Sequence, residues 1–383
     1  MLAEPARGAL PCTVEVVGDT AAFGALQQEW DELLQASDSA CVFLTWEWLY
    51  TWWKHLAESQ RLCILVVRRG NELVGVAPLG VRARDLSRAI PFPALEFLGS
   101  GYAGSDYLDI IARKSCTADA CHAISSYLAN VQLPLKWTNL RHGQALAPLV
   151  IAGLAGKGWT SEDAKTNVCP FIPLAGATWE SYLASLGSEH RYNFNRKLRN
   201  LHRKHEVTFE QVRTEEQCRE VIDVLIAQHN LRWVGRGGSN AFHTEALVAF
   251  HREWAQLALQ RGWLRLYVLR LNGKPAACLY GFLYRDSFSF YQSSFDVAYT
   301  QSSVGLIAMG LAIRSAVEEG AHEYDLLHGD EAYKSHWSSH SRDLGRVEAY
   351  PPGAAGTLCR LSMSFGRSAR ALASRVALPG KAA

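Results

Sequence analysis

The 383-residue sequence lacks several features that would assign a chain to a class at once. It has no run of about 18 uncharged apolar residues, so we expect no transmembrane helix. Its first residues, MLAEPARGALPC, have no basic start followed by an apolar stretch, which argues against a signal peptide. The nine cysteines are scattered without a C-x-x-C pair, a pattern that favours buried free thiols in a reducing compartment. We therefore expect a cytoplasmic protein.

The motifs of several enzyme classes are absent as well. There is no dinucleotide-binding G-x-G-x-x-G and no metal-ligand spacing, and His202 and His205 lack the Glu of a zinc-protease motif. We expect no metal. A net charge of +2 does not predict a nucleic-acid-binding protein. With 48% hydrophobic and 20% charged residues, the chain can build ordinary cores, and its length suits two domains.

One pattern of strands and helix occurs twice. The segments LCILVVRRGNELVGVAPLG, from Leu62, and LRLYVLRLNGKPAACLYGF, from Leu264, each read as strand, turn and strand. A further strand, a helix and another strand follow each segment. We interpret the chain as two copies of one β-meander/α/β unit, residues 1–175 and 176–352, because Pro170, Pro173 and Gly176 mark a boundary between them. Helical spacing predicts two helices in the first copy before its hairpin, the second capped by Thr45.

The segment from Phe288 to Trp337 carries the densest chemistry. It reads as an aromatic strand, a small-residue turn, an apolar-faced helix and a short strand that leads into ionisable residues. A helix entered from such a turn points unpaired N–H groups outward, which suits a phosphate or pyrophosphate. The candidate residues for holding this phosphorylated carrier are Ser302, Ser303, Gly305 and Leu306.

Titratable side chains just past the short strand indicate proton-transfer chemistry. Asp325, with its pKa raised by burial, His328 and Asp330 are alternative general bases, and Asp325 could equally be a structural carboxylate at the strand end. Tyr333 is a candidate proton donor, and Lys334 a candidate ligand for a phosphate or a polar acceptor.

Candidate acceptor-binding residues lie on either side of this segment. On the preceding strand Phe288, Phe290 and Gln292 are expected to face one way and Ser289, Tyr291 and Ser293 the other, by strict alternation. Gln292 and Asp296 are candidate acceptor ligands, although Asp296 could merely shape the turn. Trp337 joins them.

A basic segment, SEHRYNFNRKLRNLHRKHEV from Ser188, lies between the two copies. Phe194, Leu198 and Leu201 fall on one helical face, so Arg191 and Arg196 lie among the charges of the other faces. The segment is either a solvated amphipathic helix or a face that binds a phosphate or an acidic ligand. Arg232 begins a Gly-rich stretch, which is either a connection or a substrate-facing lid.

These residues carry a family resemblance. The second half resembles the GNAT (Gcn5-related N-acetyltransferase) superfamily, and residues 20 to 350 resemble its branch associated with bacterial cellulose and exopolysaccharide biosynthesis. This branch is similar to the Fem-type peptidoglycan aminoacyltransferases. The motifs that carry the resemblance are FLTWEWLYTWW, VGVAPL, FLGSGYAGSDYLD, HRYNFNRKLR, YQSSFD and YDLLHGDEAYKSHW.

The resemblance implies an α/β fold with a mixed sheet in two tandem GNAT-like units. It also implies transfer of an acyl group from acetyl-CoA or another acyl-CoA to an amine or hydroxyl of a sugar or exopolysaccharide precursor. The phosphate loop departs from the family pattern, because Gln301 to Ala308 has one extra residue before Gly305 and no second glycine in place. The equivalent place in the first unit, from Cys116, has no glycine, so we expect that unit to be structural or acceptor-binding.

Two alternatives stay open. One is Fem-like aminoacyl transfer from a charged tRNA, which the basic segment around Arg196 favours. The other is an inactive GNAT-like scaffold that assembles with a polysaccharide synthase, which the imperfect phosphate loop favours. Residues 353–383 have no acidic residue and an apolar stripe, so this tail is a candidate for peripheral contact with an anionic membrane, or else a docked or frayed terminal helix.

Overall fold

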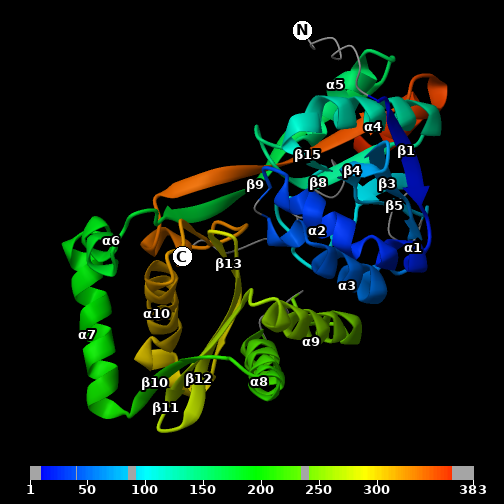
Figure 1. Cartoon of the computed structure of the whole chain (residues 1–383). Helices are drawn as coiled ribbons and strands as arrows, with labels where there is room; N and C mark the ends of the chain where they lie inside the picture. The colour runs from blue at the N-terminus through cyan, green and yellow to red at the C-terminus, as the bar shows by residue number, and fades with distance from the viewer. Residues whose placement is uncertain (1–9, 40, 85–91, 234–240, 365–383) are drawn as a thin grey trace.

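The computed structural model describes residues 10–39, 41–84, 92–233 and 241–364 of the chain. Two units make up these residues (Figure 1), and each has consecutive strands followed by a helix and a further strand, as the repeated pattern predicts. The described strands form a 4-stranded and an 11-stranded sheet. Most strand pairs are antiparallel and two, β6 with β8 and β13 with β14, are parallel, which confirms the mixed α/β fold class.

The first unit begins with a strand and helices and then runs through the first meander. Its elements are β1 (Cys12–Val17), α1 (Thr20–Ala25), α2 (Gln27–Gln35), η1 (Val42–Leu44), α3 (Trp46–Leu56), β2 (Arg61–Leu62), β3 (Ile64–Arg69), β4 (Glu72–Ala77), β5 (Leu79–Arg82), β6 (Ala94–Phe97), β7 (Ile111–Ala112), η2 (Lys114–Cys116), α4 (Thr117–Val131), β8 (Leu135–Arg141), α5 (Ala147–Ala155) and β9 (Thr160–Pro173). As predicted, Thr45 caps α3, since its hydroxyl accepts from the Trp48 amide at 3.4 Å.

The second unit begins with two additional helices and has only the short helix η4 between its last two strands, where the first unit has α5. Its elements are α6 (Trp179–Ser185), α7 (Ser188–Lys204), β10 (Val207–Gln211), α8 (Glu215–Trp233), α9 (Glu245–Gln260), β11 (Leu264–Leu271), β12 (Lys274–Tyr284), β13 (Ser287–Phe295), η3 (Val297–Ser302), α10 (Val304–Glu318), β14 (Glu323–Asp325), η4 (Lys334–His336) and β15 (His340–Tyr350). The hairpin turn at Asn272-Gly273 is confirmed, because both residues have the positive φ that such turns require.

Two long strands, β9 and β15, join strands of both units in the 11-stranded sheet, while β1, β3, β4 and β7 form the 4-stranded one. The strand order of the 11-stranded sheet is β10-β11-β12-β13-β14-β9-β15-β8-β6-β5-β2. Strand β9 of the first unit pairs with β14 of the second, and β15 of the second unit lies between β9 and β8 (Figure 1). Each unit therefore completes its sheet with the last strand of the other.

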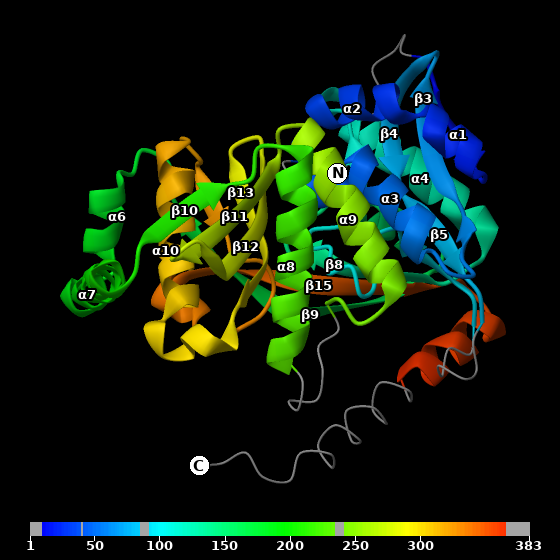
Figure 2. The ribbon, with the colours of Figure 1, turned by 90° about the horizontal axis from the view of Figure 1, so that it is seen from below.

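Helices reinforce the contact between the units. Helix α3 of the first unit packs along α9 of the second (Figure 2). Trp48 meets Trp254 edge to face with ring centroids 5.0 Å apart, and both rings are fully buried. Arg261 of the second unit forms ion pairs with Asp31 and Glu47 of the first. Helix packing and ion pairs thus fix the two units against each other, in addition to the shared sheet.

The described part of the C-terminal tail is helical over residues 354–364. Leu358 and Leu361 are exposed there, while Cys359 is buried. Residues 365–383 of the predicted membrane-contacting tail lie outside the described residues. Within the described ranges, no helix combines the length and the apolar character needed to span a membrane.

Candidate active site

A cavity of about 510 Å³ opens where strands β13 and β14 separate. The two strands pair in parallel only at Ser287, Phe288 and Ser289 of β13, because β14 ends at Asp325. Just beyond, the pairing of β13 with β12 shifts by one residue, so that Tyr291 is an extra residue in the ladder. Such a bulge re-aims side chains and leaves backbone groups unpaired. The predicted strict alternation is therefore wrong, because Phe290, Tyr291 and Gln292 all line the cavity.

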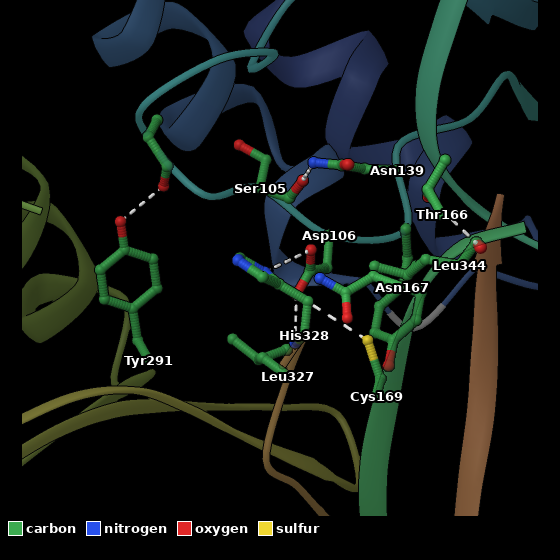
Figure 3. A network of polar contacts seen from close by, with 12 residues as sticks. Ser105, Asp106, Asn139, Thr166, Asn167, Cys169, Tyr291, Leu327, His328 and Leu344 are labelled. Carbon is green, nitrogen blue, oxygen red and sulfur yellow. Dashed lines mark hydrogen bonds and ion pairs between the residues drawn. The ribbon is translucent and has the colours of Figure 1, made fainter. Parts of the chain in front are cut away.

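The cavity brings together His328 of the second unit and Asp106 of the first (Figure 3). His328 Nδ1 lies 2.9 Å from each oxygen of the Asp106 carboxylate, and the His328 backbone amide donates to Asp106 Oδ2 at 2.9 Å. Asp106 is fully buried, whereas the His328 side chain keeps 45% of its surface exposed. The pair therefore has a buried anchor and an accessible ring.

The buried carboxylate sets the electrostatics of the ring. The hydrogen bond to Asp106 raises the pKa of the His328 imidazole above its ordinary value, and partial burial opposes the shift. Because a carboxylate only accepts, Nδ1 carries the proton toward Asp106 and Nε2 is left as an acceptor. This arrangement is the one in which a histidine accepts a proton from a neighbouring nucleophile.

Lys334 holds the segment that carries His328. Its ammonium donates to the carbonyl oxygens of His328 at 2.6 Å and Leu327 at 3.2 Å, and forms an ion pair with Glu331 at 2.9 Å. The residue is 4% exposed and lines the cavity, as does the half-exposed Tyr333. With its donors directed to backbone carbonyls and Glu331, Lys334 positions the histidine loop.

Asp106 lies on the loop between β6 and β7, and this loop brings it into contact with the second unit. Ser105 in this loop donates to the Gly99 carbonyl at 2.8 Å, and Asn139 of β8 donates to the Ser105 carbonyl at 2.7 Å. Tyr291, from the bulge of β13, donates to the Ala103 carbonyl at 2.5 Å (Figure 3). Both units thus hold the loop that presents Asp106.

Asp325 belongs to a different environment. It lines a second cavity of about 560 Å³ and does not line the one that contains His328. Its carboxylate accepts from the Tyr107 hydroxyl and from the Leu327 amide, each at 2.7 Å, and lies 3.6 Å from Arg342. Burial raises the pKa of Asp325 to about 6, although Arg342 and Tyr107 oppose the shift. These contacts are those of a structural carboxylate at a strand end.

The remaining predicted acceptor residues divide between the cavity and its surroundings. Gln292 lines the cavity. Asp296 caps the turn after β13, accepting from the Ala298 amide at 2.9 Å. Arg232 lies over the Phe295 ring, 4.7 Å from its centroid, at the end of β13. Asp330 is exposed and outside the cavity lining. The Gly-rich stretch at 234–240 lies outside the described residues.

The predicted carrier site lies at the start of α10. Ser303 precedes the helix in the left-handed conformation, with φ 54°, and its side chain makes no capping hydrogen bond. The first intrahelical bond there runs from Ile307 to Ser303, so the amides of the first turn have no acceptor within the helix. Gly305 leaves its backbone open to close approach. This geometry fits a phosphate group, and Ser302 and Leu306 flank it.

The other predicted residues lie on or beside α7. Arg191 is exposed on this helix, while Arg196, Leu306 and Trp337 line a separate, smaller cavity between α7 and α10. Among the described residues, no group of three or more His, Cys, Asp or Glu side chains is arranged to hold a metal ion.

Comparison with known proteins relates part of the second unit to a described domain family. Residues 188–335 match the family model described as "Acetyltransferase (GNAT) domain". No curated protein matches the chain. This part of the second unit therefore matches a GNAT domain, which supports acyl transfer in general, and the GNAT fold implies an acyl-CoA co-substrate in general.

Solved structures show that the whole two-unit fold occurs elsewhere. The crystal structure of FemX is 11% identical, with 84% of this chain and 95% of that chain covered and a TM-score of 0.58. The C-terminal domain of a putative lysylphosphatidylglycerol synthetase from Agrobacterium fabrum is 11% identical, with 90% and 96% covered and a TM-score of 0.53. L-PGS from Bacillus licheniformis is 10% identical, with 89% and 96% covered and a TM-score of 0.51. At these identities the likeness concerns the fold.

Proposed function

We propose that the chain transfers an acyl group, in the first instance acetyl, from acyl-CoA to an amine or hydroxyl of a saccharide acceptor. The observation that carries this proposal is the His328–Asp106 pair, whose histidine lines the cavity at the separation of β13 and β14. A general base must reach the acceptor proton, and His328 Nε2 is the unpaired acceptor of an accessible ring.

In the proposed reaction, Nε2 of His328 removes a proton from the acceptor as its nitrogen or oxygen bonds to the thioester carbon. The carbon–sulfur bond then breaks, and the thiolate leaves with a proton from the imidazolium or from Tyr333. The backbone around Tyr291 supplies donors for the oxyanion, because the bulge removes this residue from the ladder with β12. The first turn of α10 holds the phosphates of the co-substrate.

The lining of the cavity supports a hydroxyl-rich acceptor. Asn139, Thr166 and Asn167 contribute amide and hydroxyl groups from β8 and β9 (Figure 3). Two exposed aromatic rings, Tyr102 of the first unit and Tyr333 of the second, lie at the same cavity with 63% and 43% of their surfaces accessible. Flat aromatic faces beside amide groups suit the apolar faces and hydroxyls of a sugar ring.

Thermal unfolding with acetyl-CoA, followed by a free-thiol assay with amino sugars as acceptors, tests the proposal. A ligand at a hundred times its Kd adds about 2.7 kcal/mol to the free energy of unfolding, so a clear rise in Tm is expected. His328→Ala should keep this rise and lose thiol release, whereas His322→Ala, which changes an exposed histidine of the same unit, should keep both. Absence of a Tm rise at millimolar acetyl-CoA would refute acyl-CoA dependence and favour the scaffold alternative.

A further inference from the structure

A cavity of about 290 Å³ lies between α7, the start of α10 and η4, outside the site around His328. Its floor is apolar, formed by Phe194, Leu306 and Trp337, and its rim is basic, formed by His190, Arg196 and Lys197. Figure 1 shows α7 alongside α10, on the side of α10 away from the sheet. An aromatic floor under a cationic rim suits a ligand that joins a flat ring to phosphate groups.

The floor is rigid. Phe194 and Trp337 are each 4% exposed and meet edge to face, with centroids 6.0 Å apart and planes at 77°. Gly310 of α10 lies directly beneath them, and a Cβ atom added there would come within 2.3 Å of Phe194 and 2.9 Å of Trp337. Close packing of three elements therefore shapes this floor before any ligand binds.

The rim carries charge that the protein leaves uncompensated. Over the described residues, no carboxylate lies within ion-pair distance of Arg196 or Lys197, and Glu189 is the only acidic residue of α7. The side-chain amide oxygen Oδ1 of Asn193 accepts from Arg196 at 3.2 Å, which orients the guanidinium without neutralising it. Isolated cations held beside an apolar floor attract an anionic group.

One short segment connects this cavity with the reaction cavity. Tyr333 and Lys334 line the cavity that holds His328, and His336 and Trp337 line the smaller one. Leu306, from the first turn of α10, reaches the smaller cavity as well. A ligand with phosphates at the start of α10 can thus extend one end into each cavity.

We propose that the smaller cavity binds the adenosine end of acyl-CoA, with the 3′-phosphate between Arg196 and Lys197. This assignment rests on the proposed function, because it requires that acyl-CoA is the co-substrate. The adenine ring lies over the apolar floor, and the thioester end lies at His328. Helix α7, which precedes the first strand of the GNAT-like unit, thereby becomes part of the co-substrate site.

Isothermal titration of the full chain with CoA and with 3′-dephospho-CoA tests the proposal, since the two differ only in the phosphate assigned here. The wild-type protein should bind CoA more tightly by a factor on the order of ten or more, as expected for charge-assisted hydrogen bonds. In the double variant Arg196→Gln/Lys197→Gln this ratio should fall to about one, while the Kd of 3′-dephospho-CoA stays unchanged. The matched variant Arg199→Gln/Lys204→Gln removes the same charges from exposed positions of α7 and should keep the wild-type ratio.

Three results would overturn the assignment. Equal wild-type affinity for the two compounds would mean that the 3′-phosphate is not recognised. An unchanged ratio in the Arg196/Lys197 variant would place the phosphate elsewhere, and an equal loss in both variants would indicate a diffuse electrostatic effect. Failure of the wild-type protein to bind either compound would instead remove the proposed function itself and, with it, this site.

Discussion

At the scale of single residues, the chemistry depends on which nitrogen of His328 carries the proton. Asp106 accepts from Nδ1, and the backbone amide of His328 donates to the same carboxylate. The ring is therefore held in one tautomer and one orientation by an acid from the other half of the chain. Its raised pKa keeps part of the imidazole protonated, and thus unable to accept a proton, at pH values where an ordinary histidine is already neutral.

Asp106→Asn should lower kcat/KM by about 10²–10⁴, because the amide no longer enforces the tautomer that leaves Nε2 as an acceptor. Activity in the wild-type protein should rise with pH through the raised pKa of His328. The variant lacks the hydrogen bond that raises this pKa, so its residual activity should rise at lower pH. A pH profile of kcat/KM measures both effects.

Asp286→Asn, at an exposed carboxylate of the same unit, is the control and should match the wild type. A pH midpoint that Asp106→Asn leaves unchanged would mean that another group is the base.

Asp325 allows a stability prediction with a definite sign. Its folded pKa of about 6 lies above its ordinary value, so the folded state binds the proton more tightly than the unfolded state between these two values. Ionisation therefore lowers the free energy of unfolding as pH rises from about 4 to 6, by an amount of about 3 kcal/mol at 1.36 kcal/mol per pKa unit. Asp325→Asn cannot ionise and should escape this loss.

Urea unfolding of the wild type and Asp325→Asn at pH 3.5 and pH 7 measures the effect. Relative to the wild type, the variant should have a higher free energy of unfolding at pH 7 than it has at pH 3.5. A shift in favour of the wild type would show that Arg342 and Tyr107 stabilise the carboxylate more than burial penalises it.

At the scale of elements, local patterns were sufficient for much of the second unit. The hairpin β11–β12, the helix α10 and the buried face of α7 follow from turn residues and helical spacing, and the structure confirms them. Strands β9 and β15 could not be predicted in this way. Strand β9 is largely polar and contains Pro170 and Pro173, which read as a boundary, and its pairing depends on strands far along the chain.

The candidate site shows the same limit. His328 stands in a motif that the sequence singles out, but its partner Asp106 is 222 residues away. The only signal for Asp106 is its place in the FLGSGYAGSDYLD motif, which gives no role. The bulge at Tyr291 depends on the pairing of β13 with β12, which a single strand does not reveal.

The contact of α7 with α10 depends on Gly310, which leads to a prediction about packing. Gly310→Ala would place a methyl group against Phe194 and Trp337, so α7 or η4 must shift. We expect a loss of about 1–3 kcal/mol in the free energy of unfolding, more than the gain of about 1 kcal/mol in helix propensity that Ala brings.

Chemical unfolding measures this, with Gly305→Ala as the matched control on the same helix. At Gly305 an added Cβ meets Phe295 at 3.5 Å, an ordinary contact, so that variant should be neutral or slightly stabilised. Equal stability of the two variants would show that α7 is loosely attached.

At the scale of the whole molecule, paired strands connect the two units. Strand β9 supplies hydrogen bonds to β14 and β15, and β15 fills the space between β8 and β9. The candidate catalytic pair is also shared between the units, because Asp106 belongs to the first unit and His328 to the second. The predicted boundary near residue 175 thus divides the repeat in sequence, while sheet and site extend across it.

Expression of residues 1–175 and 176–383 as separate chains tests this interdependence. Alone, the second fragment exposes the edges of β14 and β15 that β9 covers, and the first fragment has an open position between β8 and β9, so each should aggregate or remain unfolded. Co-expressed, they should form a soluble complex with one thermal transition and measurable acyl transfer. Size-exclusion chromatography and calorimetry distinguish these states.

A chain ending at residue 352, which loses only segments after β15, is the control and should stay folded. If the second fragment alone folds and transfers acyl groups, the pairing of β9 with β14 and β15 is dispensable, and Asp106 has no part in the reaction.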